Sequence, residues 1–387
     1  MQARQALPSS ASVVIVGGGI MGASAAFHLA EAGVDGVVLV ERDQLGSGST
    51  GRAAGGVRAQ FSDALNVAIA TRSLEAFADF DRRPGWEIDF KRVGYLFVLT
   101  RAEDCAAFER GAELQHDLGA PIRMLAPEEV RRRCPLVAVD DVLAGAFAPA
   151  AGHVTPEAAV QGYASGARRL GARIETGCEA LAVSRAGGAI TEVVTTRGAI
   201  ATSCIICAAG PWSAEVAAMA GVELPVTPVR RQVLFTEPIP DLPAELPMTI
   251  DFATSFYFHR EGPGLLLGMS HDRDPVTFSL ETSDDWVPSL LDVAERRAPR
   301  VAAAGIKGGW AGLYEMSPDH NAMIGESAAL PGFFYAAGFS GHGFLQGPAV
   351  GEILRDLYLR RDPFVDVSPL SAERFAAGES RPELNVI

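Results

Sequence analysis

The chain has 387 residues, of which 48% are hydrophobic and 21% are charged. This composition excludes a disordered, collagen-like or coiled-coil protein, and the length suits two to three globular domains of about 150 residues each. Acidic residues outnumber basic ones by 47 to 33, which gives a net charge of −14. A surface of this sign repels polyphosphates unless basic residues cluster, and the arginine runs at 131–133 and 360–361 are typical of solvated helix faces. We therefore expect no nucleic-acid partner.

Cysteine content and the N-terminal sequence bear on the compartment. Five cysteines are too few for a disulfide framework in a chain of this length. Cys204 and Cys207 form a C-x-x-C pair, but in a strand residues three apart face opposite sides, so we interpret both as structural rather than as a redox or zinc site. Residues 1–12 lack the apolar core of a signal peptide, and the uncharged stretch 13–30 contains four glycines and a histidine. We expect a cytoplasmic protein with no membrane span and no bound metal.

The first elements in chain order form a strand–helix–strand unit. Residues 13–16 predict a buried strand, and alanines and leucines at helical spacing predict a helix that stops at Gly33. Residues 37–40 predict a second buried strand, which ends at Glu41. Such a unit belongs to the doubly wound α/β folds that bind dinucleotides.

The turn after the first strand reads G-x-G-x-x-G, and each glycine has its own function. Gly17 permits the tight turn, Gly19 lets a pyrophosphate approach the backbone, and Gly22 lets the helix pack closely on the sheet. Glu41 lies 19 residues after Gly22 and can accept hydrogen bonds from both ribose hydroxyls. Together the four residues predict a dinucleotide-binding site.

The remaining pattern alternates helical segments with short strands. The predicted helices cover residues 62–80, 102–118 and 156–170. The predicted strands cover 95–99, then a meander of 180–184, 190–196 and 200–208, and later 255–259 and 265–269. A last strand at 333–338 leads through a glycine-rich loop into a helix with Pro348 in its first turn.

Three predicted strands end in glycine close to the start of a helix, at Gly17, Gly210 and Gly338. In an open α/β sheet the carboxyl ends of such strands meet in one crevice, so three distant segments converge on one long ligand. NAD rarely needs so many segments. FAD, which carries adenine, pyrophosphate, a ribityl chain and isoalloxazine in line, does need them.

Four segments resemble the flavoprotein family of D-amino-acid oxidase, glycine oxidase and sarcosine oxidase, and the resemblance spans most of the chain. They are residues 14–22 with Glu41 and Arg42, 48–56, 208–213 and 338–344. Residues 55–61 and 310–319 are most similar to the β-type subunits of sarcosine oxidase and proline dehydrogenase. Residues 50–52 and 255–257 also resemble a D-amino-acid dehydrogenase that handles basic substrates.

The resemblance implies an α/β fold. We expect a Rossmann-like FAD-binding domain made of residues 1–84, 149–224 and 313–387. A mixed, β-rich (α+β) substrate domain of residues 85–148 and 225–312 is interleaved with it.

The resemblance also implies which residues bind the cofactor. Ser49, Thr50 and Gly51 would bring donors to the pyrophosphate, Ala180 would lie beside the adenine, and the loop 341–346 would pass under the flavin pyrimidine. The full expected set is Gly17, Gly19, Ile20, Met21, Gly22, Glu41, Arg42, Ser49, Thr50, Gly51, Ala180, Ala209, Gly210, Trp212, Gly312, Gly341, Gly343, Phe344, Leu345 and Gln346. Gly312 stands where monomeric sarcosine oxidase carries the cysteine that attaches flavin, so we expect non-covalent FAD.

Five further residues are candidates for substrate binding and catalysis. Arg58 aligns with an arginine that binds the substrate carboxylate in sarcosine oxidases, although a structural role is an alternative. Tyr257 and His259 share one strand face and can line a pocket or serve as buried structural residues. His342, between two glycines, can move a proton or simply fill the loop, and Tyr314 falls where some relatives carry a carboxylate-binding arginine.

These features predict an enzyme that moves hydride from the α-carbon of an amino acid or secondary amine to flavin N5, giving an imine that hydrolyses. The sarcosine-oxidase lysine linked to oxygen reactivity is missing near Leu266, and Leu345 replaces a second lysine. We therefore favour a dehydrogenase with another electron acceptor over an oxidase, and leave room for a partner subunit. The alternatives are a 2-hydroxy-acid dehydrogenase and a non-catalytic flavin-holding assembly factor or subunit.

Overall fold

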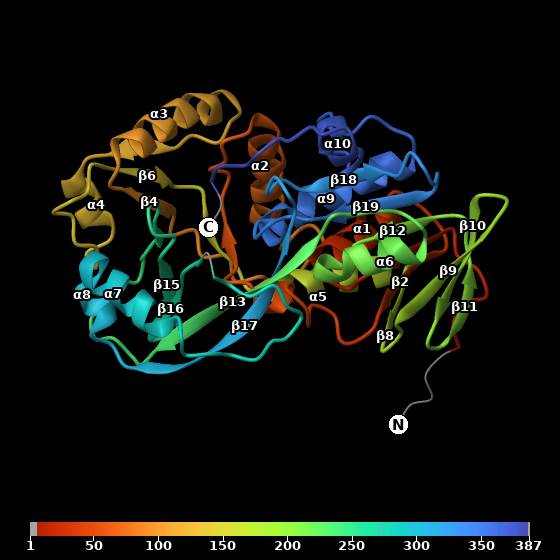
Figure 1. Cartoon of the computed structure of the whole chain (residues 1–387), viewed down its shortest axis with the longest axis horizontal. Coiled ribbons are helices and arrows are strands. Elements are labelled where there is room, and N and C mark those ends of the chain that lie inside the picture. Colours follow the sequence, from red (N-terminus) through yellow and green to blue (C-terminus); the bar gives the residue numbers. More distant parts are fainter. Residues whose placement is uncertain (1–5, 272, 386–387) are drawn as a thin grey trace.

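The computed structural model describes residues 6–271 and 273–385, and two large sheets dominate it (Figure 1). The first sheet has the strand order β18-β19-β12-β1-β2-β8. It is parallel except for its edge strand β18, which runs antiparallel to β19. Its strands are β1 (Val13–Val16), β2 (Val37–Glu41), β8 (Arg173–Thr176), β12 (Ile205–Cys207), β18 (Met323–Glu326) and β19 (Phe333–Ala337).

Alternation along these short strands supplies two separate cores. Val13 and Ile15 of β1 pack against one layer of helices, whereas Val14 and Val16 face the opposite layer. The first layer consists of α1 (Ile20–Glu31), α2 (Ala64–Ala78), α5 (Pro156–Arg169) and α9 (Gly343–Tyr358). The opposite layer holds α6 (Ser213–Met219) and the antiparallel meander β9 (Ala180–Ala186), β10 (Ala189–Thr195) and β11 (Gly198–Ala201).

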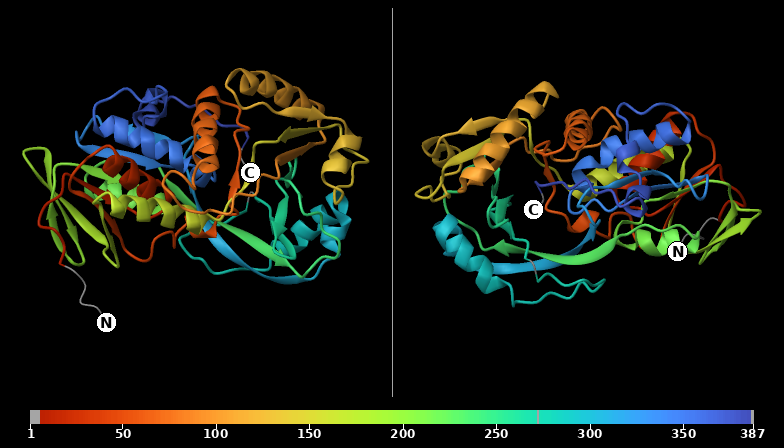
Figure 2. Two further views of the ribbon diagram at one scale, coloured as in Figure 1. Left: turned by 180° about the vertical axis from the view of Figure 1, so that it is seen from behind. Right: turned by 45° about the horizontal axis from the view of Figure 1, so that its top comes forward.

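The second large sheet is mixed and has the order β17-β13-β16-β15-β14-β4-β6-β5. Only β14 and β4 pair in parallel among its described strands. Its strands are β4 (Tyr95–Leu99), β5 (Arg123–Leu125), β6 (Ala144–Ala148), β13 (Thr227–Thr236), β14 (Met248–Asp251), β15 (Tyr257–Glu261), β16 (Gly264–Gly268) and β17 (Ile306–Met316). Helices α3 (Ala102–Asp117), α4 (Pro127–Arg133), α7 (Val287–Arg297) and α8 (Pro299–Ala302) surround it (Figure 2).

Short elements complete the chain. Strands β3 (Gly56–Val57) and β7 (Gly152–His153) pair beside the second sheet, and α10 (Glu373–Ala376) lies near the end of the described chain. Single turns of 3-10 helix occur at Thr50–Arg52, Gly210–Trp212 and Ser368–Leu370.

The structure corrects two expected elements. The expected strand 200–208 is split, because the side chain of Thr202 accepts from the Cys204 N–H at 3.1 Å and turns the chain between the meander and the parallel sheet. Pro348 lies well inside α9 rather than in its first turn, since α9 already begins at Gly343. The expected domain boundary between residues 312 and 313 falls within β17, which continues to Met316.

Two glycines of α9 hold it against α1. A Cβ on Gly347 would lie 2.4 Å from Cγ1 of Ile20, and one on Gly351 would lie 2.1 Å from Oγ of Ser24. This close packing places the N-termini of both helices at the same edge of the parallel sheet.

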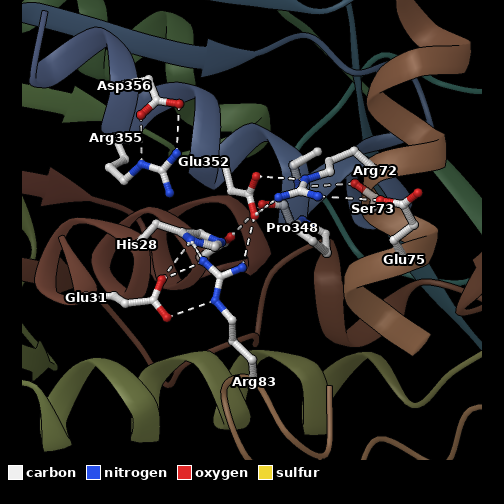
Figure 3. Close-up of polar contacts among 12 residues, drawn as sticks. His28, Glu31, Arg72, Ser73, Glu75, Arg83, Pro348, Glu352, Arg355 and Asp356 are labelled. Carbon is white, nitrogen blue, oxygen red and sulfur yellow. Dashed lines mark hydrogen bonds and ion pairs between the residues drawn. The ribbon is translucent and has the colours of Figure 1, made fainter. Parts of the chain in front are cut away.

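A polar cluster joins α1, α2 and α9 (Figure 3). Glu352 of α9 is 4% exposed and accepts from Arg72 of α2 at 3.0 Å and from Arg83 at 3.2 Å. Arg83 also bonds both carboxylate oxygens of Glu31 and contacts Nδ1 of His28 at 3.1 Å. Glu352 thus connects α9 directly to α2, and through Arg83 and Glu31 to α1.

Membrane-spanning helices, metal-binding clusters and disulfides are absent from the described residues. None of their helices is long and apolar enough to cross a membrane. No group of three His, Cys, Asp or Glu residues among them could hold a metal ion. All five cysteines lie within the described ranges and are free thiols.

Candidate functional site

A cavity of about 710 Å³ lies where the carboxyl ends of β1, β12 and β19 face the second sheet, and its size suits a small-molecule site. The three glycine-terminated strands are neighbours in the sheet, as the sequence predicts. The cavity lining includes Glu41 and Ala180 from the first sheet and the meander, and Arg58 and Tyr257 beside the second sheet. The expected cofactor residues that line it are Gly17, Gly19, Ile20, Met21, Glu41, Arg42, Ser49, Thr50, Ala180, Ala209, Gly210, Trp212, Gly312, Gly341, Gly343, Phe344 and Leu345.

The turn after β1 brings backbone to the cavity because it is built from glycine. Gly17 has φ +113°, and a Cβ there would lie 2.2 Å from the carbonyl oxygen of Ala208. Gly22 does not line the cavity. A Cβ on it would lie 1.9 Å from the carbonyl oxygen of Gly17, so its place is between helix and strand.

Both helix N-termini at the cavity lack side-chain caps. The cap positions of α1 and α9 are Gly19 and His342, and neither makes a side-chain cap hydrogen bond or is followed by an acid in the first turn. The positive ends of two helix dipoles therefore face the same space, and only the Ile20 N–H among the first-turn donors of the two helices has a side-chain acceptor in the described residues. A long anion with charge near both points is the ligand that suits this arrangement.

The loop after β2 closes over the start of α1. Thr50 Oγ1 accepts from the Ile20 N–H at 3.2 Å, and Ser49 Oγ donates to the Leu313 carbonyl at 2.6 Å. Gly51 lies outside the lining, where its N–H donates to the Gly46 carbonyl at 2.7 Å and shapes the loop.

Glu41 is held by backbone at the end of β2. Its carboxylate accepts from the N–H of Gly18 at 2.7 Å and from that of Asp43 at 2.8 Å. Arg42 lies 3.8 Å from the ring centre of Trp212, which stacks on Phe278. Phe278 comes from the second sheet's connections and was not foreseen as a lining residue.

Gln346 points away from the cavity. It is 1% exposed, and its Nε2 donates to Asn66 Oδ1 at 3.2 Å. Gln346 therefore connects the first turns of α9 to α2 and does not face the cofactor space.

Arg58 lies in the wall of the cavity and is 2% exposed. Its Nη2 donates to the Asn385 carbonyl at 2.7 Å, its Nη1 donates to the Gln60 carbonyl, and its guanidinium lies 4.4 Å from the centre of the Phe61 ring. It forms no ion pair with a carboxylate of the described residues. Burial lowers the pKa of Arg58, because it disfavours the charged form.

Tyr257, Tyr314 and His342 also line the cavity, whereas His259 does not. Burial raises the pKa of Tyr257 well above its usual value and lowers that of His342 to about 3, so both are neutral at pH 7. His259 is 1% exposed, and its ring packs at a tilt against that of His153, with ring centres 4.4 Å apart. His259 lies on the same face of β15 as Tyr257. At Tyr257 this face lines the cavity, but two residues further along, at His259, it packs against β7.

Sequence reasoning missed several lining residues of the second sheet, namely Tyr95, Arg231, Met248, Trp310 and Glu315. Arg231 is paired with Asp274 and donates to the His271 carbonyl. Glu315 accepts from the N–H of Gly338 at 3.1 Å, and burial raises its pKa to about 8 against the opposing effect of backbone N–H groups. Strand register could have indicated Arg231, which lies opposite Gly312.

A family model described as "DAO: FAD dependent oxidoreductase" matches residues 12–357. The chain belongs to the DAO family of FAD-dependent oxidoreductases. The expected fold class is confirmed by an L-proline dehydrogenase structure from P. horikoshii, which is 32% identical, covers 97% of this chain and all of its own, and has a TM-score of 0.92. Glycine oxidase from Geobacillus kaustophilus is 25% identical over 95% of this chain and 99% of its own, with a TM-score of 0.84.

Curated relatives of this DAO-family chain include longer proteins. Rat mitochondrial dimethylglycine dehydrogenase is 28% identical over 94% of this chain and 45% of its own length. Mouse mitochondrial sarcosine dehydrogenase is 28% identical over 96% and 42%. The chain thus spans less than half the length of these relatives.

FAD is the cofactor that DAO-family membership implies, and the cavity fits it. Two uncapped helix N-termini suit the pyrophosphate and the electron-rich edge of the flavin pyrimidine. A carboxylate at the end of β2 suits a ribose, and Gly210 leaves open space on the cavity side.

Proposed function

We propose that the chain binds FAD without a covalent link and oxidises the C–N bond of an amino acid or secondary amine that carries a carboxylate. Bound FAD would supply the hydride acceptor, N5 of its isoalloxazine, and the resulting imine would hydrolyse in water. The names of the relatives support the substrate class, because proline, sarcosine, dimethylglycine and glycine are all carboxylate-bearing amines.

The observation that carries the substrate class is the charge of Arg58. A buried cation is costly unless an anion or strong acceptors offset it. Among the described residues Arg58 has two carbonyl oxygens, the Tyr95 hydroxyl, aromatic rings and the Glu383 carboxylate beyond ion-pair distance, but no direct ion pair. A substrate carboxylate would complete the set. Arg231 is less suited to bind the substrate carboxylate, because Asp274 already neutralises its charge.

The cavity walls define the remaining roles. The uncharged side chains of Tyr95, Tyr257 and Tyr314 would surround the amine. Burial raises their pKa values, so their hydroxyls stay protonated. The N-terminus of α9 favours electron density on the pyrimidine edge. No lysine lines the cavity within the described residues, which supports an electron acceptor other than oxygen.

The test is an absorbance spectrum of the purified protein followed by anaerobic titration. We expect a yellow protein whose flavin bleaches with proline, sarcosine or a D-amino acid, and far more slowly with pyrrolidine, which is proline without its carboxylate. Bleaching by 2-hydroxy acids alone would contradict amine oxidation. A flavin that no small molecule reduces would favour a flavin-holding subunit, and fast reoxidation by air would contradict the dehydrogenase assignment.

Replacing Gly22 by alanine should reduce FAD affinity about tenfold or more, because the new methyl group would push α1 away from the β1 turn. Flavin fluorescence during dialysis against excess apoprotein measures this loss. Gly33→Ala, at a site with φ +82° and no atom near the new methyl, controls for general backbone strain. Equal FAD loss in both variants would show that strain, not the turn, is responsible.

A further inference from the structure

The last described residues return to Arg58 in the wall of the cavity. After α10 the chain runs back beside α2 towards the middle of the molecule (Figure 2). We call residues 381–385 the C-terminal segment. The Arg381 N–H donates to Asp319 at 3.1 Å, the Arg381 carbonyl accepts from Asn321 at 2.8 Å, and the Glu383 N–H donates to the Asp319 carbonyl at 3.2 Å. The segment is therefore fixed by backbone contacts.

Glu383 is the main side-chain anchor of the segment. It is 2% exposed, and its Oε1 accepts from both N and Oγ of Ser62, at 2.9 and 2.8 Å. Its Oε2 accepts from Asn66 Nδ2 at 2.9 Å. Arg381 adds an ion pair with Asp63 at 2.5 Å. The anchor ties the segment to the residues that lead into α2.

The segment ends, within the described residues, on Arg58. The Asn385 carbonyl accepts from Arg58 Nη2 at 2.7 Å, and the Asn385 N–H donates back to Glu383 Oε1 at 2.9 Å. Asn385 Nδ2 also lies 3.4 Å from the Gln60 carbonyl, which is the second acceptor of Arg58. Glu383 thus fixes the carbonyl that fixes the guanidinium.

We propose that Glu383 is a positioning residue for Arg58: it holds the Asn385 carbonyl against the guanidinium and so aims the remaining N–H groups at a ligand carboxylate in the cavity. The carboxylate part of this proposal rests on the proposed function. The positioning part stands on the contacts alone. A planar guanidinium binds a carboxylate in a narrow range of orientations, so an acceptor behind it sets the affinity for that group.

Through Asn66, Glu383 is also connected to α9. Asn66 donates to Glu383 and accepts from Gln346 of α9 at 3.2 Å. A continuous line of hydrogen bonds therefore runs from Arg58 through the segment to the first turns of α9. Loss of Glu383 should affect Arg58 more than Gln346. The backbone of Gln346 remains held by α9, whereas Arg58 loses the support of its acceptor, the Asn385 carbonyl.

The experiment compares Glu383→Ala and Glu383→Gln with Leu384→Ser as the matched control. Leu384 is 67% exposed and lies next to Glu383 in the segment. Phenylglyoxal modification of Arg58, located by peptide mass spectrometry on the holoprotein, reports how firmly the guanidinium is held. The affinity for pyrrole-2-carboxylate, an anion with no hydride to give, is read from the flavin absorbance change.

In Glu383→Ala we expect Arg58 to react about tenfold faster and the carboxylate to bind about tenfold more weakly, with the FAD content unchanged. Glu383→Gln should fall between it and the wild type, because an amide oxygen still accepts from Ser62, and it serves as the test if the alanine variant does not fold. Leu384→Ser should match the wild type. Unchanged Arg58 reactivity in the Glu383 variants would overturn the positioning role.

Faster modification with unchanged carboxylate affinity would overturn the proposal as well. Failure of the proposed function looks different: no amine would bleach the wild-type flavin, while Arg58 reactivity would still respond to Glu383.

Discussion

Replacing Arg58 by methionine should lower kcat/KM for the amine that bleaches the flavin by about 10²- to 10³-fold, because it removes the buried charge that we propose binds the carboxylate. Methionine fills a similar volume beside Phe61 and Tyr95, so the wall of the cavity keeps its packing. The loss should lie mainly in KM if the carboxylate contact is equal in the ground and transition states. Anaerobic stopped-flow reduction over a range of substrate concentrations separates the two constants.

The control is the same amine without its carboxylate. Wild type and Arg58→Met should reduce slowly and at similar rates with that analogue, since neither can use the missing contact. Arg58→Lys should recover part of the lost activity, because it restores the charge but not the planar fork. An equal loss for both substrates would show that Arg58 only supports the fold.

The sequence predicts correctly those elements whose structure depends on residues that are neighbours in the chain. The β1 turn needs glycine at 17 and 22 because backbone oxygens stand about 2 Å from any added Cβ, and that requirement is visible in the sequence. The split of 200–208 was not visible, because it depends on one hydroxyl of Thr202 that replaces a ladder hydrogen bond. The start of α9 was misplaced because glycine and proline both weaken the helical signal there.

The site shows the same division. Most of the expected cofactor residues line the cavity, apart from Gly22, Gly51 and Gln346, because the strand ends that hold them are neighbours. Contacts across hundreds of residues escaped prediction: Glu383 meets Ser62 over a separation of 321 positions. His259 has the same face as Tyr257 but a different neighbour, and periodicity along one strand says nothing of where a cavity ends.

Replacing Glu352 by alanine should lower the free energy of unfolding of the apoprotein by about 2–3 kcal/mol, because Arg72 and Arg83 would lose their shared buried acceptor. The expected cost is below the ~3–5 kcal/mol of a fully buried pair, since solvent reaches both arginines, and each keeps another carboxylate, Glu75 or Glu31. Chemical denaturation followed by fluorescence measures the change. Glu75→Gln, which alters an exposed partner of Arg72, should change stability by no more than about 0.5 kcal/mol.

The pH dependence of the stability difference between wild type and Glu352→Ala provides a second test of this prediction. Burial is the largest single effect and raises the pKa of Glu352, but the hydrogen bonds from Arg72 and Arg83 and the positive charge around them together outweigh it, so the net shift is downward. Hydrogen bonds from Arg83 and His28 likewise lower the pKa of Glu31 to about 2. A carboxyl with a lowered folded-state pKa stabilises the fold above its unfolded pKa and stops doing so as pH falls through the folded one. The advantage of wild type over Glu352→Ala should therefore be constant from pH 6 to 8 and shrink below about pH 4. An advantage that persists unchanged into acid would show that Glu352 stabilises the three helices by packing, not by its charge.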